Sequence, residues 1–369
     1  MAGDPSREAL SPDDLGALAG DLRRWLVRRP QSPAGAFYAW RDALTGEPAF
    51  EYPEVTGYAL THLAGQRPPL EVEVEAGRQA GGWLVRRVSA GDLSAHSGPA
   101  GGAVYNFDLA MVASGLLSFG SLVADEAMVT TGLGLAEELR DQIEADPRLP
   151  AVRRHRSAGS AAFPPVRRSW SSQGGAHLLK VVQCLVRADA LGADGCGEAA
   201  ASLVRTRGNL QREDGSFVTH EQDGVVLHPH LYAVEGLWMH GVATGDGIAL
   251  GRARAATEWA WRQQLPSGGF PRWTPSAPGH GDDVLVEQTD VTSQVVRAAL
   301  LVGERPAGFE AALARLAGIA LQDGEDGSAL PYQPSSGRPH MNTAATLFGA
   351  QALAMAVTSS PAVSWSDLV

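Results

Sequence analysis

The sequence is poor in cysteine, in lysine and in charged residues generally. Two cysteines, Cys184 and Cys196, occur among 369 residues. They are too few for a disulfide framework or a cysteine-rich zinc site, and such a low content is typical of a reducing compartment. Charged residues make up 19% of the chain, and Lys180 is the only lysine. The net charge of −11 at pH 7 argues against a general binder of nucleic acid or of anionic membranes.

Long apolar runs are also missing. No segment approaches 18 uninterrupted apolar residues, so we expect no membrane span. The first residues, MAGDPSREALSPDDL, are partly acidic and lack the apolar core of a signal peptide. Together with the low cysteine content, these features predict a cytoplasmic protein.

The chain is rich in turns that follow amphipathic stretches. It contains 43 glycines and 23 prolines, and 44% of its residues are apolar. Four segments resemble one another: QSPAGAF at 31, QREDGSF at 211, QLPSGGF at 264 and QDGEDGSALPY at 322. Each places glycine where a helix must stop and reverse. The pattern indicates a repeated structural unit.

A second recurrence is a short polar stretch that leads into an apolar helix. The six stretches are EVTGY at 54, YNFD at 105, SWSSQ at 169, HPHLYAVE at 228, EQTDVTSQ at 287 and RPHMNT at 338. Their spacing of about 52 to 64 residues predicts one helical hairpin per interval. The weakest outer helix is Glu71 to Val88, where LEVEVE alternates with period two and fits a strand equally well.

Six outer-then-inner hairpins predict an all-α fold, an (α/α)6 toroid that forms a single domain over residues 1–369. An open helical solenoid or an irregular bundle is the alternative. We expect the inner helices to start near the residues Glu54, Asp108, Ser172, His230, Asp290 and Asn342. Because consecutive hairpins run in the same sense, all six polar stretches should meet at one end of the ring.

The QREDGSF segment resembles the repeat of terpenoid cyclases and of protein prenyltransferase β-subunits, which are (α/α)6 toroids. The order of the polar stretches is similar to that in prenyltransferase-like proteins of bacterial polysaccharide gene clusters. The resemblance implies the toroidal fold. The cyclase motifs D-x-D-D and D-D-x-x-D are absent from the sequence, and their absence argues against a cyclase function.

The converging polar stretches predict a site. Six helix starts favour anions and hydrogen-bond acceptors. We expect His230 and His340 to face each other as proton-transfer groups, with Asp108 and Glu54 orienting them or the substrate. The residues expected to bind substrate at this end are Tyr58, Trp170, Tyr232, Glu235, Asp290 and Asn342. The pair of histidines is similar in position to that of the N-acylglucosamine and cellobiose 2-epimerase family, which implies proton abstraction and return. For each residue, an ordinary helix cap or packing role is the alternative.

An arginine cluster precedes the third inner helix. Guanidinium groups recognise carboxylate or phosphate, so Arg153, Arg154, Arg167 and Arg168 predict a site for an anionic substrate, with a solvated loop as the alternative. No metal or cofactor is expected, because neither HPH at 228 nor His280, Asp282 and Asp283 has the spacing of a zinc site.

The sequence therefore favours an enzyme that acts on a carbohydrate or sugar-like metabolite by acid–base proton transfer, and the arginine cluster extends this expectation to an anionic oligosaccharide. Epimerisation, elimination and hydrolysis all stay open. A terpenoid-cyclase-like or prenyltransferase-like enzyme and a non-catalytic binding protein are the alternatives.

Overall fold

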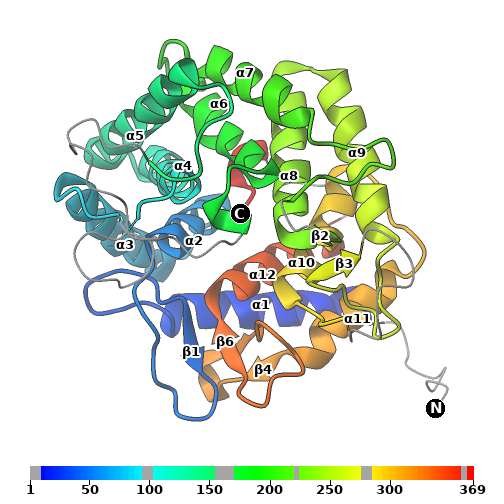
Figure 1. Ribbon diagram of the computed structural model, residues 1–369. Helices are drawn as coiled ribbons and strands as arrows, with labels where there is room; N and C mark the ends of the chain where they lie inside the picture. The colour runs from blue at the N-terminus through cyan, green and yellow to red at the C-terminus, as the bar shows by residue number, and fades with distance from the viewer. Residues whose placement is uncertain (1–9, 94–102, 154–169, 220–223, 276–284, 359–363) are drawn as a thin grey trace.

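Twelve α-helices form two concentric rings in the computed structural model, which describes residues 10–93, 103–153, 170–219, 224–275, 285–358 and 364–369 (Figure 1). The outer helices are α1 (Pro12–Arg28), α3 (Glu71–Ser89), α5 (Glu126–Ala145), α7 (Cys196–Gly208), α9 (Gly247–Trp261) and α11 (Phe309–Ile319). The inner helices are α2 (Pro53–Gly65), α4 (Asn106–Val123), α6 (Val182–Ala190), α8 (Leu227–Thr244), α10 (Thr289–Leu301) and α12 (Thr343–Val357). The predicted (α/α)6 toroid is confirmed.

One doubtful helix is confirmed, and another starts later than expected. The doubtful segment that begins at Glu71 is the helix α3, so its alternating LEVEVE pattern does not produce a strand. The third inner helix starts later than Ser172. A short 3-10 turn, η1 (Trp170–Ser172), comes first, and a 3-10 helix, η2 (Ala176–Val181), then leads directly into α6.

The inner and outer rings differ in how their surfaces are covered. In α4, all residues from Asn106 to Gly120 are buried, because neighbouring helices surround it. The outer helix α1 is amphipathic and buries only Leu15, Leu22, Trp25 and Leu26. A capping box at Ser11, in which Ser11 and Asp14 satisfy each other's backbone N–H groups, fixes its start. Burial against neighbours on both sides explains why the inner helices read as almost wholly apolar.

In four of the hairpins, a glycine turn packs against the next outer helix. Gly35, Gly215, Gly268 and Gly327 all have positive φ, between 89° and 104°. A Cβ atom on any of them would lie within 2.5 Å of a backbone oxygen of the neighbouring outer helix. Only glycine provides both the left-handed conformation and the close approach. This double requirement is the physical origin of the sequence repeat.

In three of the four segments, the opening glutamine stabilises the same contact with its side chain. The side-chain amide of Gln211 donates to the carbonyl of Gly215 in its own turn and to that of Arg252 in α9. Gln31 and Gln264 make the equivalent pairs of bonds. The fourth turn closes the ring, because Gly327 lies against the backbone of Asp21 in α1.

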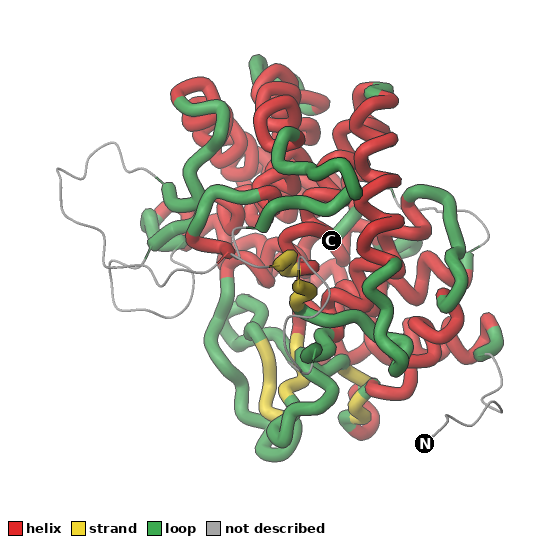
Figure 2. Tube along the Cα trace, turned by 45° about the vertical axis from the view of Figure 1, so that its right-hand side comes forward, coloured by secondary structure: helices red, strands yellow, loops and turns green. Residues whose placement is uncertain are grey.

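Short strands lie at the end of the ring where the inner helices begin. The antiparallel pairs are β1 (Trp40–Asp42) with β6 (His340–Asn342), β2 (Gly224–Val226) with β3 (Trp273–Pro275), and β4 (Leu321–Gln322) with β5 (Ser328–Ala329). In Figure 2 the pair β1–β6 and the loops around it lie below the main body of helices. The β1–β6 pair links the first and last hairpins.

The centre of the ring is filled from the other end by the chain terminus. The last residues, Leu368 and Val369, are fully buried, and the C-terminus lies inside the inner ring (Figure 1). Side chains of four inner helices bind backbone oxygens of residues 366–369, and these side chains are Ser118, Gln183, Arg297 and Gln351. The segment therefore forms a floor beneath the ring's cavity.

Within the described residues, α4 is long and apolar enough to cross a membrane by length and composition. Its 18 residues have a mean hydropathy of 1.4, and 83% of them are buried within the protein. A central helix of a helical ring meets the same criterion.

We predict that Gly268→Ala lowers the free energy of unfolding by more than about 1 kcal/mol, because the new Cβ meets Ala311 and φ is +89°. The matched control is Gly251→Ala in α9, where no atom lies within 4 Å of the added Cβ. That change should be stabilising by about 0.5–1 kcal/mol. Urea unfolding measures both, and equal effects would contradict the glycine-contact explanation.

Candidate functional site

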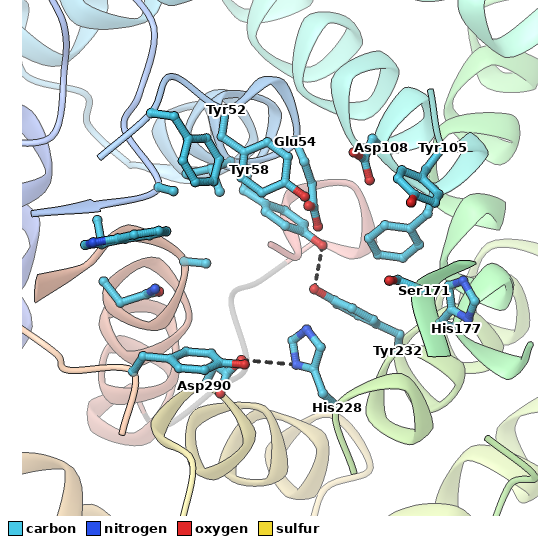
Figure 3. Close-up of a pocket in the computed structure, with 18 of the residues that line it drawn as sticks. Tyr52, Glu54, Tyr58, Tyr105, Asp108, Ser171, His177, His228, Tyr232 and Asp290 are labelled. Carbon is cyan, nitrogen blue, oxygen red and sulfur yellow. Dashed lines mark hydrogen bonds and ion pairs between the residues drawn. The ribbon is translucent and has the colours of Figure 1, made fainter. Parts of the chain in front are cut away.

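A cavity of about 730 Å³ opens where the inner helices begin. Figure 3 shows its side chains converging from several helices. The lining residues that bear on function are Trp40, Tyr52, Glu54, Tyr58, Tyr105, Phe107, Asp108, Trp170, His177, His228, Tyr232, Asp290, Tyr332, His340 and Asn342. Members of all six polar stretches are included, so the expected convergence occurs.

Two carboxyl groups from neighbouring inner helices form one side of the cavity. The hydroxyl groups of Tyr52 and Tyr58 lie beside the carboxyl group of Glu54 in α2 and form hydrogen-bonding neighbours for it. Asp108 in α4 is 5% exposed, and its Oδ2 has no hydrogen-bond partner among the described residues. A buried acceptor without a partner is costly, which is typical of a group that meets a ligand.

The surroundings of the two carboxyl groups separate their acidities. Burial raises the pKa of Asp108 well above its ordinary value, and the nearby charge of Glu54 raises it further. Burial also raises the pKa of Glu54, but the hydrogen bonds from both tyrosines and the charge of Lys180 act against it. Asp108 is therefore the member of the pair that keeps its proton more readily.

Two tyrosines form the bottom of the cavity. The hydroxyl oxygens of Tyr58 and Tyr232 are 2.7 Å apart and share a hydrogen bond across the ring (Figure 3). Phe107 packs on Tyr232 with a ring-centroid distance of 4.7 Å, and Phe348 packs on Tyr58 at 5.4 Å. These contacts fix both phenol rings in orientation.

An imidazole lies opposite the carboxyl pair. His228 Nδ1 is 2.7 Å from Gln294 Oε1 and 3.3 Å from Asp290 Oδ2. Burial lowers the pKa of His228, and the charge of Asp290 partly offsets this. Trp170 stands edge-on to His228 and also to His177, at centroid distances of 5.6 and 5.2 Å. The histidine side of the cavity thus has its own carboxylate.

The rim of the cavity is aromatic. His340 is stacked on Trp40 with the two ring planes at 13° and their centroids 5.1 Å apart. Asn342 lies nearby and also caps α12, since its Oδ1 accepts a hydrogen bond from Ala345 N. Flat aromatic surfaces of this kind suit the apolar faces of sugars.

The expectation that His230 faces His340 is wrong. The His230 side chain is fully buried between α8 and α9, against Phe217 and Trp259, and does not line the cavity. Its Nδ1 accepts a hydrogen bond from Phe217 N, and its Nε2 is 3.0 Å from Ala256 O. Both ring nitrogens are therefore used within the protein.

A repeated structural position explains the role of His230. In three other hairpins, a threonine hydroxyl accepts the hydrogen bond from the backbone N–H that follows the glycine turn. These threonines are Thr56, Thr292 and Thr346. His230 replaces them in the fourth hairpin, so it holds the turn to its inner helix.

Glu235 and Arg153 are also placed differently from the expectation. Glu235 is fully buried beneath the tyrosines, where it pairs with Lys180 and Arg297, and does not line the cavity. Arg153 pairs with Glu138 of α5 at 2.5 and 2.6 Å, and it lines a separate, smaller pocket. Arg154, Arg167 and Arg168 lie outside the described residues, as do His280, Asp282 and Asp283.

Metal ligation has no candidate in the part of the chain that the structure describes, where no group of three or more His, Cys, Asp or Glu side chains could hold an ion.

Sequence reasoning missed several lining residues. Trp40 begins the strand β1 and Tyr332 ends the repeat segment at 322, but neither belongs to one of the six polar stretches. Tyr52 is two residues before Glu54, and Tyr105 opens the polar stretch YNFD, so both could have been included on that ground. Beneath the lining, Lys180 and Arg297 were also missed, because only their charge within an apolar stretch marks them.

Comparisons with known proteins support the fold. No protein-family model matches the chain, and no curated protein matches its sequence. Among solved structures, an unsaturated glucuronyl hydrolase responsible for glycosaminoglycan degradation in a Bacillus species matches with a TM-score of 0.69 and 13% identity, over 92% of this chain and 96% of that one. Cellobiose 2-epimerase from Bacillus thermoamylovorans matches with a TM-score of 0.69 and 9% identity, over 92% and 99%.

A third match is a mutant unsaturated glucuronyl hydrolase from Streptococcus agalactiae in complex with dGlcA-GalNAc6S. Its TM-score is 0.64 at 9% identity, over 96% of this chain and 94% of that one. The protein therefore has the fold of six-hairpin toroids that include carbohydrate-active hydrolases and an epimerase. The resemblance to terpenoid cyclases and prenyltransferases stays a prediction.

We predict that His230→Ala lowers the melting temperature and that His230→Thr, which restores the acceptor found in three other hairpins, recovers part of the loss. Only position 230 is varied, because it is the position that accepts the hydrogen bond of the fourth glycine turn. Thermal unfolding followed by circular dichroism measures the effect. Equal melting temperatures for the alanine and threonine variants would contradict the assigned role.

The same variant tests acid stability. Burial lowers the pKa of His230 to about 4 in the folded protein, against about 6.5 in an unfolded chain. Below about pH 6.5 the imidazole of residue 230 binds a proton in the unfolded chain but not in the folded protein. The contribution of His230 to the free energy of unfolding therefore falls as the pH drops toward 4. We expect His230→Thr to lose less stability than the wild type over this window, by up to about 3 kcal/mol. Parallel pH dependences would contradict a buried neutral imidazole.

Proposed function

We propose that the protein is a glycoside hydrolase whose acid–base pair is Asp108 and Glu54. The observation that carries the proposal is the buried, unpartnered Oδ2 of Asp108 beside the hydrogen-bonded carboxylate of Glu54. Glycosidases in general use two carboxyl groups, one protonated and one ionised, on either side of the bond that is cleaved. The solved structures of similar fold are consistent with this class of reaction.

The roles follow from the surroundings of each group. Asp108, with the higher pKa, donates its proton to the glycosidic oxygen as the bond to the leaving group breaks. Glu54 stays ionised and stabilises the positive charge that develops on the sugar ring. A water molecule then forms the new bond to the sugar carbon and gives up a proton to Glu54, and exchange with solvent restores both carboxyl groups. Trp40, Trp170 and the other aromatic rings provide the surfaces on which sugar rings lie. The substrate class is an oligosaccharide, and an anionic one stays a prediction.

Epimerisation is the second candidate, because His228 and His177 both line the cavity. Burial lowers the pKa of His228, so its imidazole is neutral at pH 7 and can accept a proton from a sugar carbon. Running the reaction in D2O separates the two candidates. An epimerase that works through solvent-exchanging groups incorporates deuterium at a sugar carbon, whereas a glycoside hydrolase releases a smaller sugar without it.

A terpenoid-cyclase-like function needs an aromatic cavity, and this cavity is aromatic. The three carboxyl groups that line it, Glu54, Asp108 and Asp290, suit sugar hydroxyls better than an isoprenoid chain. An isoprenoid panel, assayed beside the sugar panel, checks this alternative directly.

We predict that Asp108→Asn and Glu54→Gln each reduce kcat by about 10²–10⁴-fold, because each removes one partner of proton transfer or charge stabilisation. Glu198→Gln, an exposed change on α7, should leave kcat unchanged. The assay is release of the terminal sugar from a disaccharide panel that includes dGlcA-GalNAc6S, with detection by mass spectrometry.

The pH dependence supplies a further check. Activity requires ionised Glu54 and protonated Asp108, so the profile should be bell-shaped, with its alkaline limb set by Asp108. The raised pKa of Asp108 places that limb above the range of an ordinary aspartate. Full activity in Asp108→Asn, or turnover of no sugar in the panel, would contradict the proposed function.

A further inference from the structure

A buried cation lies directly beneath the cavity. Lys180, the only lysine of the chain, sits at the end of η2 and is 0% exposed. Its Nζ is 2.5 Å from Glu235 Oε2. Burying an ammonium group costs free energy even when the group is paired with a carboxylate, so the presence of Lys180 at this depth calls for a functional explanation.

The ammonium group is close to the tyrosines at the bottom of the cavity. Lys180 Nζ lies 5.6 Å from the ring centroid of Tyr58 and 5.3 Å from that of Tyr232. Tyr58 in turn hydrogen-bonds Glu54. Lys180 does not line the cavity. It can therefore act on a substrate only through the residues above it.

The anion paired with Lys180 is shared with a second cation. Arg297 of α10 hydrogen-bonds Glu235 and also donates to Val369 O at 2.6 Å and Gln351 Oε1 at 2.8 Å. The side chains of Lys180, Glu235 and Arg297 together carry one net positive charge. This trio connects the C-terminal floor of the ring to the base of the cavity.

The positive charge does not act equally on the two carboxyl groups. Burial raises the pKa of Glu54, while Tyr52, Tyr58 and Lys180 lower it. For Asp108, burial and the charge of Glu54 both raise the pKa, with no compensating cation. The titratable and charged groups around the pair and around Lys180, from every helix that packs there, are Tyr52, Tyr58, Tyr105, His228, Tyr232, Glu235, Asp290 and Arg297.

We propose that Lys180 is a positioning residue of the site: from beneath the tyrosines, its ammonium group keeps Glu54 as the anionic member of the carboxyl pair and leaves the proton on Asp108. The roles of the two carboxyl groups rest on the proposed function, but the electrostatic coupling of Lys180 to Glu54 does not. Glu235 and Arg297 hold the ammonium group at the required depth.

Because Lys180 is the only lysine, its coupling to Glu54 can be measured without assigning any other signal. Protein labelled with 13C at lysine Cε gives one side-chain NMR resonance whose shift reports the charge of Nζ. Burial lowers the pKa of Lys180 to about 8, which lies in a range accessible to titration. Coupling between two sites is reciprocal, so removing the charge of Glu54 must also change the titration of Lys180.

We expect Glu54→Gln to move the Lys180 titration to lower pH, and the matched variant Asp108→Asn to move it less. An unchanged titration in Glu54→Gln, or equal shifts in both variants, would overturn the proposal. Neither variant alters the buried trio, so the measurement does not depend on whether Lys180 itself can be replaced.

The functional consequence is tested with Lys180→Met and with the double variant Lys180→Met/Glu235→Gln, which avoids leaving Glu235 as a carboxylate that has lost one of its two cations. In Lys180→Met the acid limb of the pH–rate profile should move to higher pH by about 1 pH unit, because Glu54 has lost a neighbouring cation. In the double variant the shift should be smaller, because the change also removes the negative charge of Glu235. Arg254→Met removes a half-exposed cation from α9 and should leave the limb in place.

The outcomes separate the two proposals. A uniform loss of kcat at every pH, with the acid limb in its wild-type position, would make Lys180 a purely structural residue and overturn the inference. A Lys180 titration that responds to Glu54→Gln in a protein that cleaves no glycoside would support the coupling and contradict the proposed function.

Discussion

The contact between a glycine turn and the backbone of the next outer helix is the constraint on which the rest of the structure depends. At Gly215 and Gly268 the α-carbon approaches a neighbouring carbonyl so closely that no side chain fits between them. Each contact sets the height and angle of one hairpin against the next. Gly327 makes the last contact with α1, so the sequence repeat ends where the ring closes. Four of the six hairpins are held in this way, and the inner helices of the ring point in one direction (Figure 1).

That shared direction creates a balance between two opposing effects at the cavity. Helix starts favour negative charge because their N–H groups are unpaired. Burial disfavours it, because a carboxylate loses its hydration. Glu54 receives two tyrosine hydrogen bonds and a nearby cation, whereas Asp108 receives neither. The same fold therefore gives two carboxyl groups of unequal acidity from helices that lie side by side.

Much of the fold could be predicted from the sequence, because the glycine contacts and the apolar inner helices both recur in it. The individual site residues were harder to predict. In HPH, His228 and His230 are two residues apart, and on a helix such residues point in nearly opposite directions, so only one can face the cavity. The spacing shows that the two histidines face opposite ways, but it does not show which of them faces the cavity. His228 does, so the prediction for His230 was wrong.

The structural role of His230 is shared with Thr56, Thr292 and Thr346, but the loops between the glycine turn and the inner helix differ in length among the hairpins. Equivalent positions therefore do not fall at equal intervals in the sequence. Glu235 shows a related effect of depth. It lies seven residues after His228, on the same face of α8 but two turns lower. A residue on the correct face of an inner helix can thus belong to the layer beneath the cavity.

The two sides of the cavity differ in what they leave free for a ligand, and this difference favours carboxyl chemistry over imidazole chemistry. On the histidine side, His228 Nδ1 is already bonded to Gln294 and close to Asp290. On the carboxyl side, Asp108 Oδ2 is buried without a partner in the described residues. Under the proposed function, protonated Asp108 donates a hydrogen bond to the glycosidic oxygen of a bound sugar, which removes the cost of burying the carboxyl group without a partner. The same hydrogen bond aligns the proton for its transfer to the leaving group.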